Sequence, residues 1–184
     1  MILVGFMGAG KTSVGRSLAQ HLHWAFEDLD DRIIANEGRS ISEIFRDSGE
    51  AAFRELEHAA LLAVLEELGA GMAKVVALGG GAFAQKKNTA ALRKLNMPII
   101  FLDADAEELW QRCSRQAADG GLERPLLQDR KQFQKLYASR RTAYRQASFK
   151  IRTSGREIDE IAGQIIKSLG LRTLAIRNQE GEVE

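Results

Sequence analysis

Residues 2–12 read ILVGFMGAGKT, and the order of residue types in this segment points to one architecture. Its first residues are apolar and β-prone, and they lead into glycines. Apolar residues then recur at helical spacing at Val14, Leu18 and Leu22. This order predicts a strand, a glycine loop and a helix.

The glycine loop itself, residues 5–12, fits G-x-x-x-x-G-K-[ST] in full. Glycines at this spacing let backbone N–H groups face a phosphate, and the helix that follows adds its positive N-terminal end. The match between a predicted strand and a predicted helix favours nucleotide binding over a chance glycine turn. Lys11 is expected to bridge the β- and γ-phosphates of a bound nucleotide, and the Thr12 hydroxyl to ligate Mg²⁺. The loop residues predicted to bind the nucleotide are Gly8, Ala9, Gly10, Lys11, Thr12 and Ser13.

Strand-like and helical segments alternate along the rest of the chain. Short apolar runs end in glycine or acidic residues, and between them apolar residues recur every three or four positions. Because parallel strands need helical crossovers, this alternation predicts an α/β fold with a parallel sheet covered on both faces. A capping box at Ser40 predicts a short helix, and a second helix is predicted from Phe53 to Gly69. The predicted strands cover residues 2–6, 24–30, 74–78, 98–103 and 149–151.

Composition excludes several classes of protein. A length of 184 residues fits one domain, given about 150 residues per domain. The 26 Lys and Arg residues against 25 Asp and Glu leave a net charge of +1, so no basic field predicts nucleic acid or an anionic membrane as a partner. No run approaches the roughly 18 apolar residues of a membrane span. Cys113 is the single cysteine, and a reducing cytoplasm is the expected compartment.

Acidic residues and glycines follow the predicted strands at one edge of the sheet, where ligands bind in such folds. Asp28 and Asp30 lie two positions apart, so on a strand they would face the same side. The alternative is that Asp28, Asp30 and Asp31 form a solvated helix start, where Asp is favoured as the N-cap. Residues 79–81 are three glycines, which would let a backbone approach a ligand closely.

Six motifs in order resemble the shikimate kinase family over residues 2–169. Besides the loop at 5–12, the motifs are Asp28-Leu29-Asp30, Phe53-Arg54-Glu55-Leu56-Glu57, Gly79-Gly80-Gly81, Arg124-Pro125-Leu126-Leu127, and Arg140 followed four residues later by Tyr144. The resemblance implies the P-loop kinase fold, a five-stranded parallel sheet of order 2-3-1-4-5 with a mobile lid. It also implies transfer of the γ-phosphoryl group of ATP to the 3-hydroxyl of shikimate, giving shikimate 3-phosphate and ADP.

The same resemblance implies roles for individual residues. Asp28 would be linked to Mg²⁺, and Asp30 would accept the proton of the substrate hydroxyl. The catalytic set would be Asp30, Lys11 and Arg124, with Arg124 in the lid over the transferring phosphate. Arg112 would contact ATP, although a solvated helix position explains it equally well. The residues implied for shikimate binding are Asp30, Arg54, Gly79, Gly80, Gly81 and Arg140.

Two of these arginines have simpler interpretations. Arg54 could form only a surface pair with Glu57, and Arg140 lies on a helix that is basic throughout. Planar guanidinium groups nevertheless match a carboxylate in bidentate fashion, which favours a role in binding the shikimate carboxylate.

The expected organisation is one kinase domain over residues 1–170, with a lid at about 117–129 and a substrate-binding helical part at about 31–69. A C-terminal tail covers 171–184. The expected partner is the small-molecule substrate, with no nucleic acid, no membrane and a monomeric chain. The competing interpretations are another P-loop kinase, such as gluconate kinase or adenylate kinase, and a nucleotide-binding module without catalytic activity. That module would be expected to lack Lys11, one of the acids or Arg54, and all are present.

Overall fold

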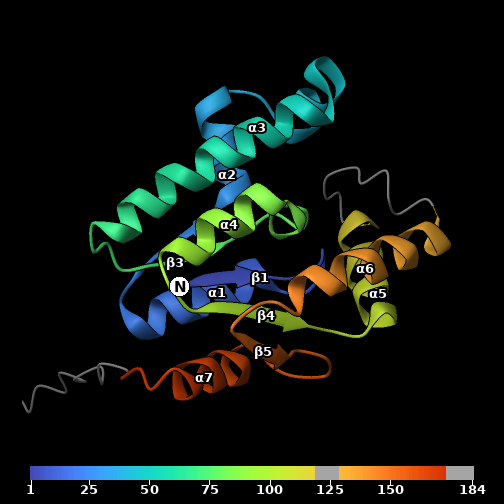
Figure 1. The fold of residues 1–184 in the computed structure, drawn as a ribbon. Helices are drawn as coiled ribbons and strands as arrows, with labels where there is room; N and C mark the ends of the chain where they lie inside the picture. The colour runs from blue at the N-terminus through green and yellow to red at the C-terminus, as the bar shows by residue number, and fades with distance from the viewer. Residues whose placement is uncertain (119–128, 173–184) are drawn as a thin grey trace, which may run out of the picture.

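The computed structural model describes residues 1–118 and 129–172, and these form a five-stranded parallel sheet with helices on both faces (Figure 1). The strand order is β2-β3-β1-β4-β5, which confirms the expected topology. Pairing aligns Ile2 with both Val76 and Ile99. The strands are β1 (Ile2–Val4), β2 (Ala25–Asp28), β3 (Lys74–Ala77), β4 (Ile99–Asp103) and β5 (Phe149–Arg152).

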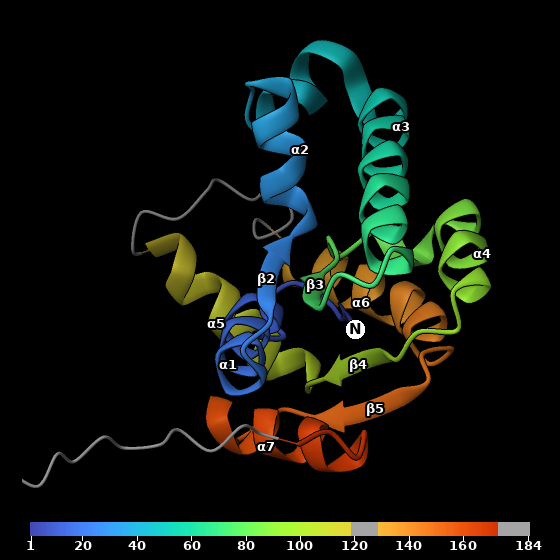
Figure 2. The same cartoon turned by 90° about the vertical axis from the view of Figure 1, so that its left-hand side faces the viewer.

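The central strands form the core of the molecule. Every residue of β1 and of β4 is buried, as expected for parallel strands that are covered on both faces. Helices α1 and α7 pack against each other on one side of the sheet, and α3 and α4 lie on the other side (Figure 2). The helices are α1 (Lys11–Leu22), α2 (Leu29–Glu37), α3 (Ile41–Gly69), α4 (Lys86–Lys94), α5 (Ala106–Ala118), α6 (Arg130–Tyr144) and α7 (Ile158–Ser168), with a 3₁₀ turn η1 (Ala82–Ala84).

Helix α2 follows the carboxyl end of β2, and α3 lies beside α2 and leads back to the start of β3 (Figure 2). The capping box at the start of α3 is confirmed, because Ser40 Oγ accepts from the Glu43 amide at 3.2 Å and Glu43 Oε2 accepts from the Ser40 amide at 2.8 Å. The predicted short helix is confirmed as the first segment of α3, which counts 29 residues in all. A kink at Gly49, with φ 80°, joins the two helices that the sequence pattern separates.

The predicted lid and tail fall mostly outside the described residues. Residues 117 and 118, where the lid was expected to begin, belong to the end of α5. Asp129, at the other end, caps α6 through its side chain. Residues 119–128, which include Arg124, and residues 173–184 of the predicted tail are not among those described.

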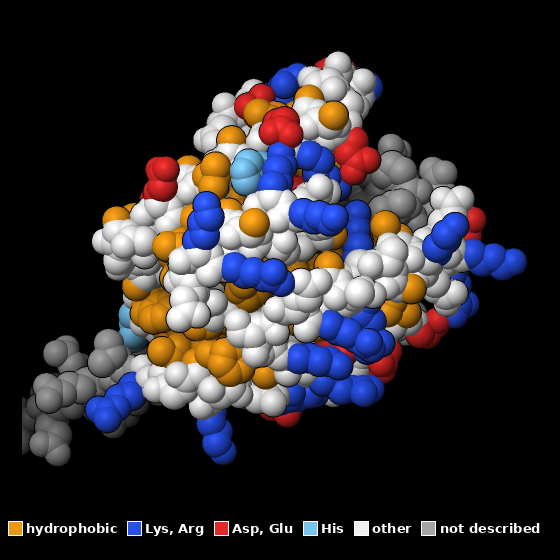
Figure 3. All heavy atoms as spheres, viewed as in Figure 1, with side chains coloured by type: hydrophobic (Ala, Val, Ile, Leu, Met, Phe, Trp, Pro, Cys, Tyr) orange, Lys and Arg blue, Asp and Glu red, His pale blue; other side chains and the backbone are white. Residues whose placement is uncertain are grey.

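Surface charge on the described part of the chain is dominated by Lys and Arg over the face that carries α4 and α6 (Figure 3). Exposed members include Lys86, Arg93, Lys131, Lys135 and Arg145. This fits a solvated basic helix face of the kind expected for α6. None of the described helices is both long enough and apolar enough to span a bilayer.

Candidate active site

The phosphate loop joins β1 to α1 and has backbone conformations that favour glycine. Gly8 has φ 78° and Gly10 has φ 87°, both in the left-handed region. A Cβ atom at position 8 would also lie 2.9 Å from Cys113 Sγ, so this position is restricted by space as well as by conformation. Gly10 is the N-cap of α1 and supplies no side-chain cap. The loop therefore leads directly into a helix N-terminus, the arrangement that binds phosphate.

Lys11 extends back along this loop. Its Nζ donates to the backbone carbonyls of Gly5 at 3.0 Å and Phe6 at 3.2 Å. The ammonium group therefore lies beside the loop in which a phosphate would sit, as the sequence pattern predicts.

The predicted Mg²⁺ ligands Thr12 and Asp28 come together in the structure. The Thr12 hydroxyl donates to Asp28 Oδ2 at 2.9 Å. Hydroxyl and carboxylate oxygens are the donors that Mg²⁺ prefers, and this ion is usually held by one or two protein groups with water and substrate phosphates. No group of three or more potential His, Cys, Asp or Glu ligands exists among the described residues. A hydroxyl and a carboxylate at this distance are a pair that could hold Mg²⁺ together with nucleotide phosphates and water.

Asp28 and Asp30 lie on different elements, which corrects the prediction that both project from one strand. Asp28 ends β2, while Asp30 is in the first turn of α2. Asp28 Oδ1 accepts from the Asp30 amide at 3.1 Å, so Asp28 is the N-cap of α2, as the alternative interpretation proposed. Its second oxygen still faces Thr12. The same carboxylate therefore caps a helix and contributes to the candidate metal site.

The Asp30 side chain occupies the most unusual position in the site. Its Oδ1 is buried and has no hydrogen-bond partner among the described residues. Burial raises the pKa of this carboxyl, the charge of Asp28 raises it further, and Lys11 acts in the opposite direction. An unpaired buried carboxylate oxygen is costly unless a ligand supplies a donor. A substrate hydroxyl would be such a donor.

Arg54 on α3 is held by two carboxylates. Its Nη1 donates to both oxygens of Glu57, at 3.1 and 3.0 Å, and its Nε and Nη2 donate to Glu50 at 3.2 and 3.0 Å. The interpretation as a mere surface pair is wrong, because the Glu57 side chain is only 1% exposed. Burial raises the pKa of Glu57, and its ion pair with Arg54 opposes that shift.

The glycine turn at residues 79–81 lies directly against these side chains. A Cβ atom at position 79 would lie 2.6 Å from Asp30 Oδ1, and one at position 81 would lie 2.7 Å from Arg54 Nη1. At position 80 the nearest atom would be Arg140 Nη1, at 3.5 Å. The turn thus brings together Asp30, Arg54 and Arg140, which the sequence places on three separate elements.

Arg140 and Arg141 are neighbours on α6 but face different groups. Arg140 lies near the glycine turn, with its guanidinium 5.7 Å from the centre of the Phe6 ring. Arg141 instead pairs with Asp103 at 3.1 Å. The assignment of Arg140 rather than Arg141 to the predicted substrate site therefore agrees with the geometry.

Arg112 lies beside the phosphate loop. Its Nη1 donates to the Gly8 carbonyl and its Nη2 to the Thr153 carbonyl, both at 3.3 Å, while Glu108 forms an ion pair with it. A guanidinium in this place can contact a nucleotide bound to the loop. The side chain is 30% exposed, so a role of Arg112 in contacting ATP stays a prediction.

Sequence reasoning missed one supporting group, Glu50, and one contact of Tyr144, a residue of the sixth motif. Glu50 was not singled out, although its spacing of four residues before Arg54 on a helix is a signal that could have identified it. The hydroxyl of Tyr144 donates to the Gly80 carbonyl, while its ring lies 5.2 Å from that of Phe101. No local pattern indicates this contact, because α6 and the glycine turn are 64 residues apart.

Comparisons with known proteins cover nearly all of the chain. The family model for shikimate kinase matches residues 7–170. The shikimate kinase of Persephonella marina is 38% identical over 165 residues, which are 89% of this chain and 94% of that protein. The shikimate kinase of Geobacter sulfurreducens is also 38% identical, over 90% of this chain and 87% of that protein.

Solved structures agree with these relatives. The shikimate kinase of Acinetobacter baumannii in complex with shikimate has a TM-score of 0.77 and 35% identity, covering 91% of this chain and 90% of that one. The shikimate kinase of Aquifex aeolicus has a TM-score of 0.75 and 30% identity, covering 92% and 94%. A sugar kinase from Janibacter, at 14% identity and a TM-score of 0.64, shares the fold alone.

Proposed function

The chain belongs to the shikimate kinase family, and we propose that it transfers the γ-phosphoryl group of ATP to the 3-hydroxyl of shikimate, giving shikimate 3-phosphate and ADP. The observation that carries this proposal is that the buried Oδ1 of Asp30 has no hydrogen-bond partner among the described residues, and that the guanidinium groups of Arg54 and Arg140 lie against the same glycine turn. A hydroxyl donor and a carboxylate on one small molecule would satisfy both features at once.

Asp30 is the proposed base of the reaction. In phosphoryl transfer, a protein mainly positions the reactants and neutralises charge, and a carboxylate accepts the proton of the attacking hydroxyl. Desolvation raises the pKa of Asp30, which makes its ionised form a better proton acceptor. The proton of the substrate hydroxyl would pass to Asp30 Oδ1 as the oxygen attacks the γ-phosphorus.

The phosphate loop holds the other reactant. The N-terminus of α1 and the Lys11 ammonium stabilise the negative charge of the nucleotide phosphates. Thr12 and Asp28 would hold Mg²⁺, which neutralises charge on phosphate oxygens when it is bound. Arg112 would contact the nucleotide from the side of α5. Arg124 is proposed to act from the lid, although it lies outside the described residues.

Arg54 and Arg140 are proposed to bind the carboxylate of the substrate. A guanidinium fork can make two parallel hydrogen bonds to a carboxylate. Arg54 is already oriented by Glu50 and Glu57, so little side-chain freedom remains to be lost when substrate binds. These residues favour a substrate that carries a carboxylate as well as a hydroxyl, a class that excludes AMP as the acceptor and includes gluconate.

An acceptor panel tests the proposal. ADP release would be measured with ATP and Mg²⁺ in the presence of shikimate, quinate, gluconate or AMP, with a reaction lacking any acceptor as the background. We expect rapid ADP release with shikimate alone. Faster turnover of gluconate or AMP would contradict the proposed substrate, while background rates with every acceptor would indicate a nucleotide-binding module without kinase activity.

A further inference from the structure

The glycine turn at residues 79–81 packs closely against two side chains of the proposed substrate site. Asp30 and Arg54 approach its backbone so closely that a Cβ atom at position 79 or 81 would lie less than 3.0 Å from them. A shift of the turn would therefore move, or release, the two side chains that face the proposed substrate. In active sites a misplacement of about 1 Å can cost roughly 100-fold in rate.

Asn88 on α4 links this turn to another part of the molecule. Its side-chain Nδ2 donates to the carbonyl of Ala82, the residue after the three glycines, at 3.0 Å. Its Oδ1 lies 2.7 Å from His58 Nδ1 on α3. Because the amide nitrogen is directed to Ala82, the oxygen faces His58, and the His58 Nδ1 carries the hydrogen of that bond.

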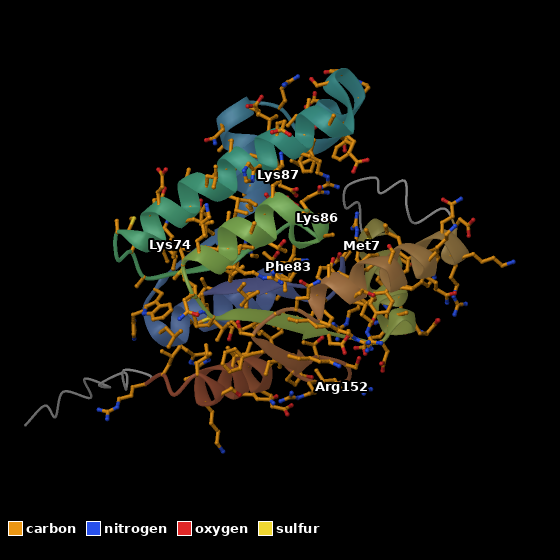
Figure 4. The ribbon with its side chains drawn as sticks, in the orientation of Figure 1. Met7, Lys74, Phe83, Lys86, Lys87 and Arg152 are labelled. Carbon is orange, nitrogen blue, oxygen red and sulfur yellow. The ribbon has the colours of Figure 1, made fainter. Side chains whose placement is uncertain are left out.

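His58 lies on the part of α3 that carries the proposed substrate residues. It follows Glu57 directly and comes four residues, about one helical turn, after Arg54. Two hydrogen bonds through one amide thus connect Ala82 in η1 to this turn of α3. Figure 4 marks the same region by Phe83 in η1 and Lys87 at the start of α4, and Lys87 forms an ion pair with Glu55 at 2.6 Å.

Asn88 is fully buried, with 0% of its surface exposed. A buried amide needs partners for its polar atoms, and an apolar side chain of similar volume would fill the same space without that requirement. The neighbouring buried position on the same helix, Leu92, is occupied by such an apolar residue. Each end of the Asn88 amide has a partner, Ala82 directly after the glycine turn and His58 directly after Glu57.

We propose that Asn88 is a positioning residue for phosphoryl transfer: it fixes the glycine turn against α3 and thereby sets the place of Arg54 and Asp30. The proposal rests on the proposed function for its kinetic readout. It makes Asn88 neither a substrate contact nor a proton carrier, because its side chain is fully buried and its two polar atoms bond to Ala82 and His58.

The test compares Asn88→Leu, which keeps the number and branching of the side-chain heavy atoms and removes both bonds, with Leu92→Ala, which removes buried apolar volume from the same helix and leaves both bonds in place. Asn88→Leu is expected to raise the KM for shikimate by about tenfold while the KM for ATP changes by less than about twofold. His58→Phe, at a less buried position, breaks one bond and is expected to give a smaller change in the same direction. Leu92→Ala is expected to lower the melting temperature while leaving both KM values close to wild type.

Hydrogen exchange of the backbone amides in residues 79–85 provides a readout that needs no activity. Faster exchange in this segment for Asn88→Leu than for Leu92→Ala is expected. Equal exchange in the two variants, or KM values for shikimate and ATP that rise together, would overturn the proposal. Wild-type protein that does not phosphorylate shikimate would instead refute the proposed function, and the exchange comparison alone would then decide the role of Asn88.

Discussion

The phosphate loop and the glycine turn at residues 79–81 both rely on glycine, but for different physical reasons. In the loop, Gly8 and Gly10 adopt φ angles of 78° and 87°, which other residues rarely adopt. In the turn, none of the three glycines lies in the left-handed region. There the requirement is space, since Asp30 and Arg54 occupy the positions that Cβ atoms would take.

This difference shows how the two ends of the site are constructed. The nucleotide end is built mainly from backbone, whose shape follows from a local sequence pattern. The substrate end is built from charged side chains, partly buried, that arrive from α2, α3 and α6 and pack on a backbone without side chains of its own. Variants of the substrate end should therefore change shikimate kinetics, whereas variants of the loop should change nucleotide binding and stability.

The largest effect is expected at Asp30, whose side chain occupies the space that a Cβ atom at position 79 would need. Asp30→Asn removes the proton acceptor and nearly preserves the shape of the side chain. Turnover should fall by about 10²- to 10⁴-fold, with the Kd for ATP little changed. Steady-state kinetics and nucleotide titration would measure both. Asp31→Asn, an exposed neighbour in the same helical turn, is the matched control and should be close to wild type.

The dependence of kcat/KM on pH provides a second test of the role of Asp30. The Asp30 carboxyl must be ionised to accept a proton, so activity is lost as the pH falls through its pKa. Because burial raises that pKa, the acid limb of kcat/KM should lie above the ordinary range of an Asp carboxyl. An acid limb that persists unchanged in Asp30→Asn would assign it to another group.

A smaller effect is expected for Arg54→Lys and Arg140→Lys. Each variant keeps the charge and loses the planar fork. If a charge-assisted hydrogen bond contributes about 1.5–3 kcal/mol, the KM for shikimate should rise roughly 10- to 100-fold, with less change in kcat. Arg141→Lys provides the control on α6, since Arg141 pairs with Asp103. A rise confined to the KM for ATP would show that these arginines contact the nucleotide and not shikimate.

The three glycines of the turn should not be equivalent. Gly81→Ala would place a methyl group 2.7 Å from the Arg54 guanidinium and displace it, so the KM for shikimate should rise about tenfold, or ~1.4 kcal/mol. In Gly80→Ala the nearest atom would be at 3.5 Å, an ordinary contact, and kinetics should stay near wild type. Equal KM values for shikimate in Gly81→Ala and Gly80→Ala would show that lack of space is not what requires glycine at position 81.

The smallest effect is expected in the loop. At Gly10 there is room for a methyl group, with the nearest atom at 3.8 Å, but φ is 87°. Gly10→Ala should therefore lose about 1 kcal/mol in the free energy of unfolding through backbone strain alone. Chemical denaturation would measure this loss. No loss of stability would show that the conformation of the loop does not require glycine at this position.

Much of the site could be predicted because its motifs are local. The loop at 5–12 specifies its own backbone, and the capping box at Ser40 specifies a helix start. The prediction that Asp28 and Asp30 share a strand was wrong because β-strand and helix start could not be separated within two residues. The capping role of Asp28 depends on where β2 ends, which is determined by its pairing with β3.

The remaining features depend on contacts between distant segments. The support of Arg54 by a fully buried Glu57 depends on how α3 packs, and the Tyr144 contact to Gly80 depends on the position of α6. Asn88 and His58 are 30 residues apart, and neither belongs to a recognisable pattern. Sequence periodicity identifies which elements form, but it does not say which polar side chains meet between them.

Asp28 uses its two carboxylate oxygens for two different halves of the site, one for the Thr12 hydroxyl and one for the Asp30 amide. A rotation of this single group would alter both contacts together. If nucleotide binding rotates the Asp28 carboxylate, the two binding equilibria are linked, and linkage is reciprocal. If bound nucleotide changes the affinity for the acceptor by some factor, bound acceptor changes the affinity for nucleotide by the same factor.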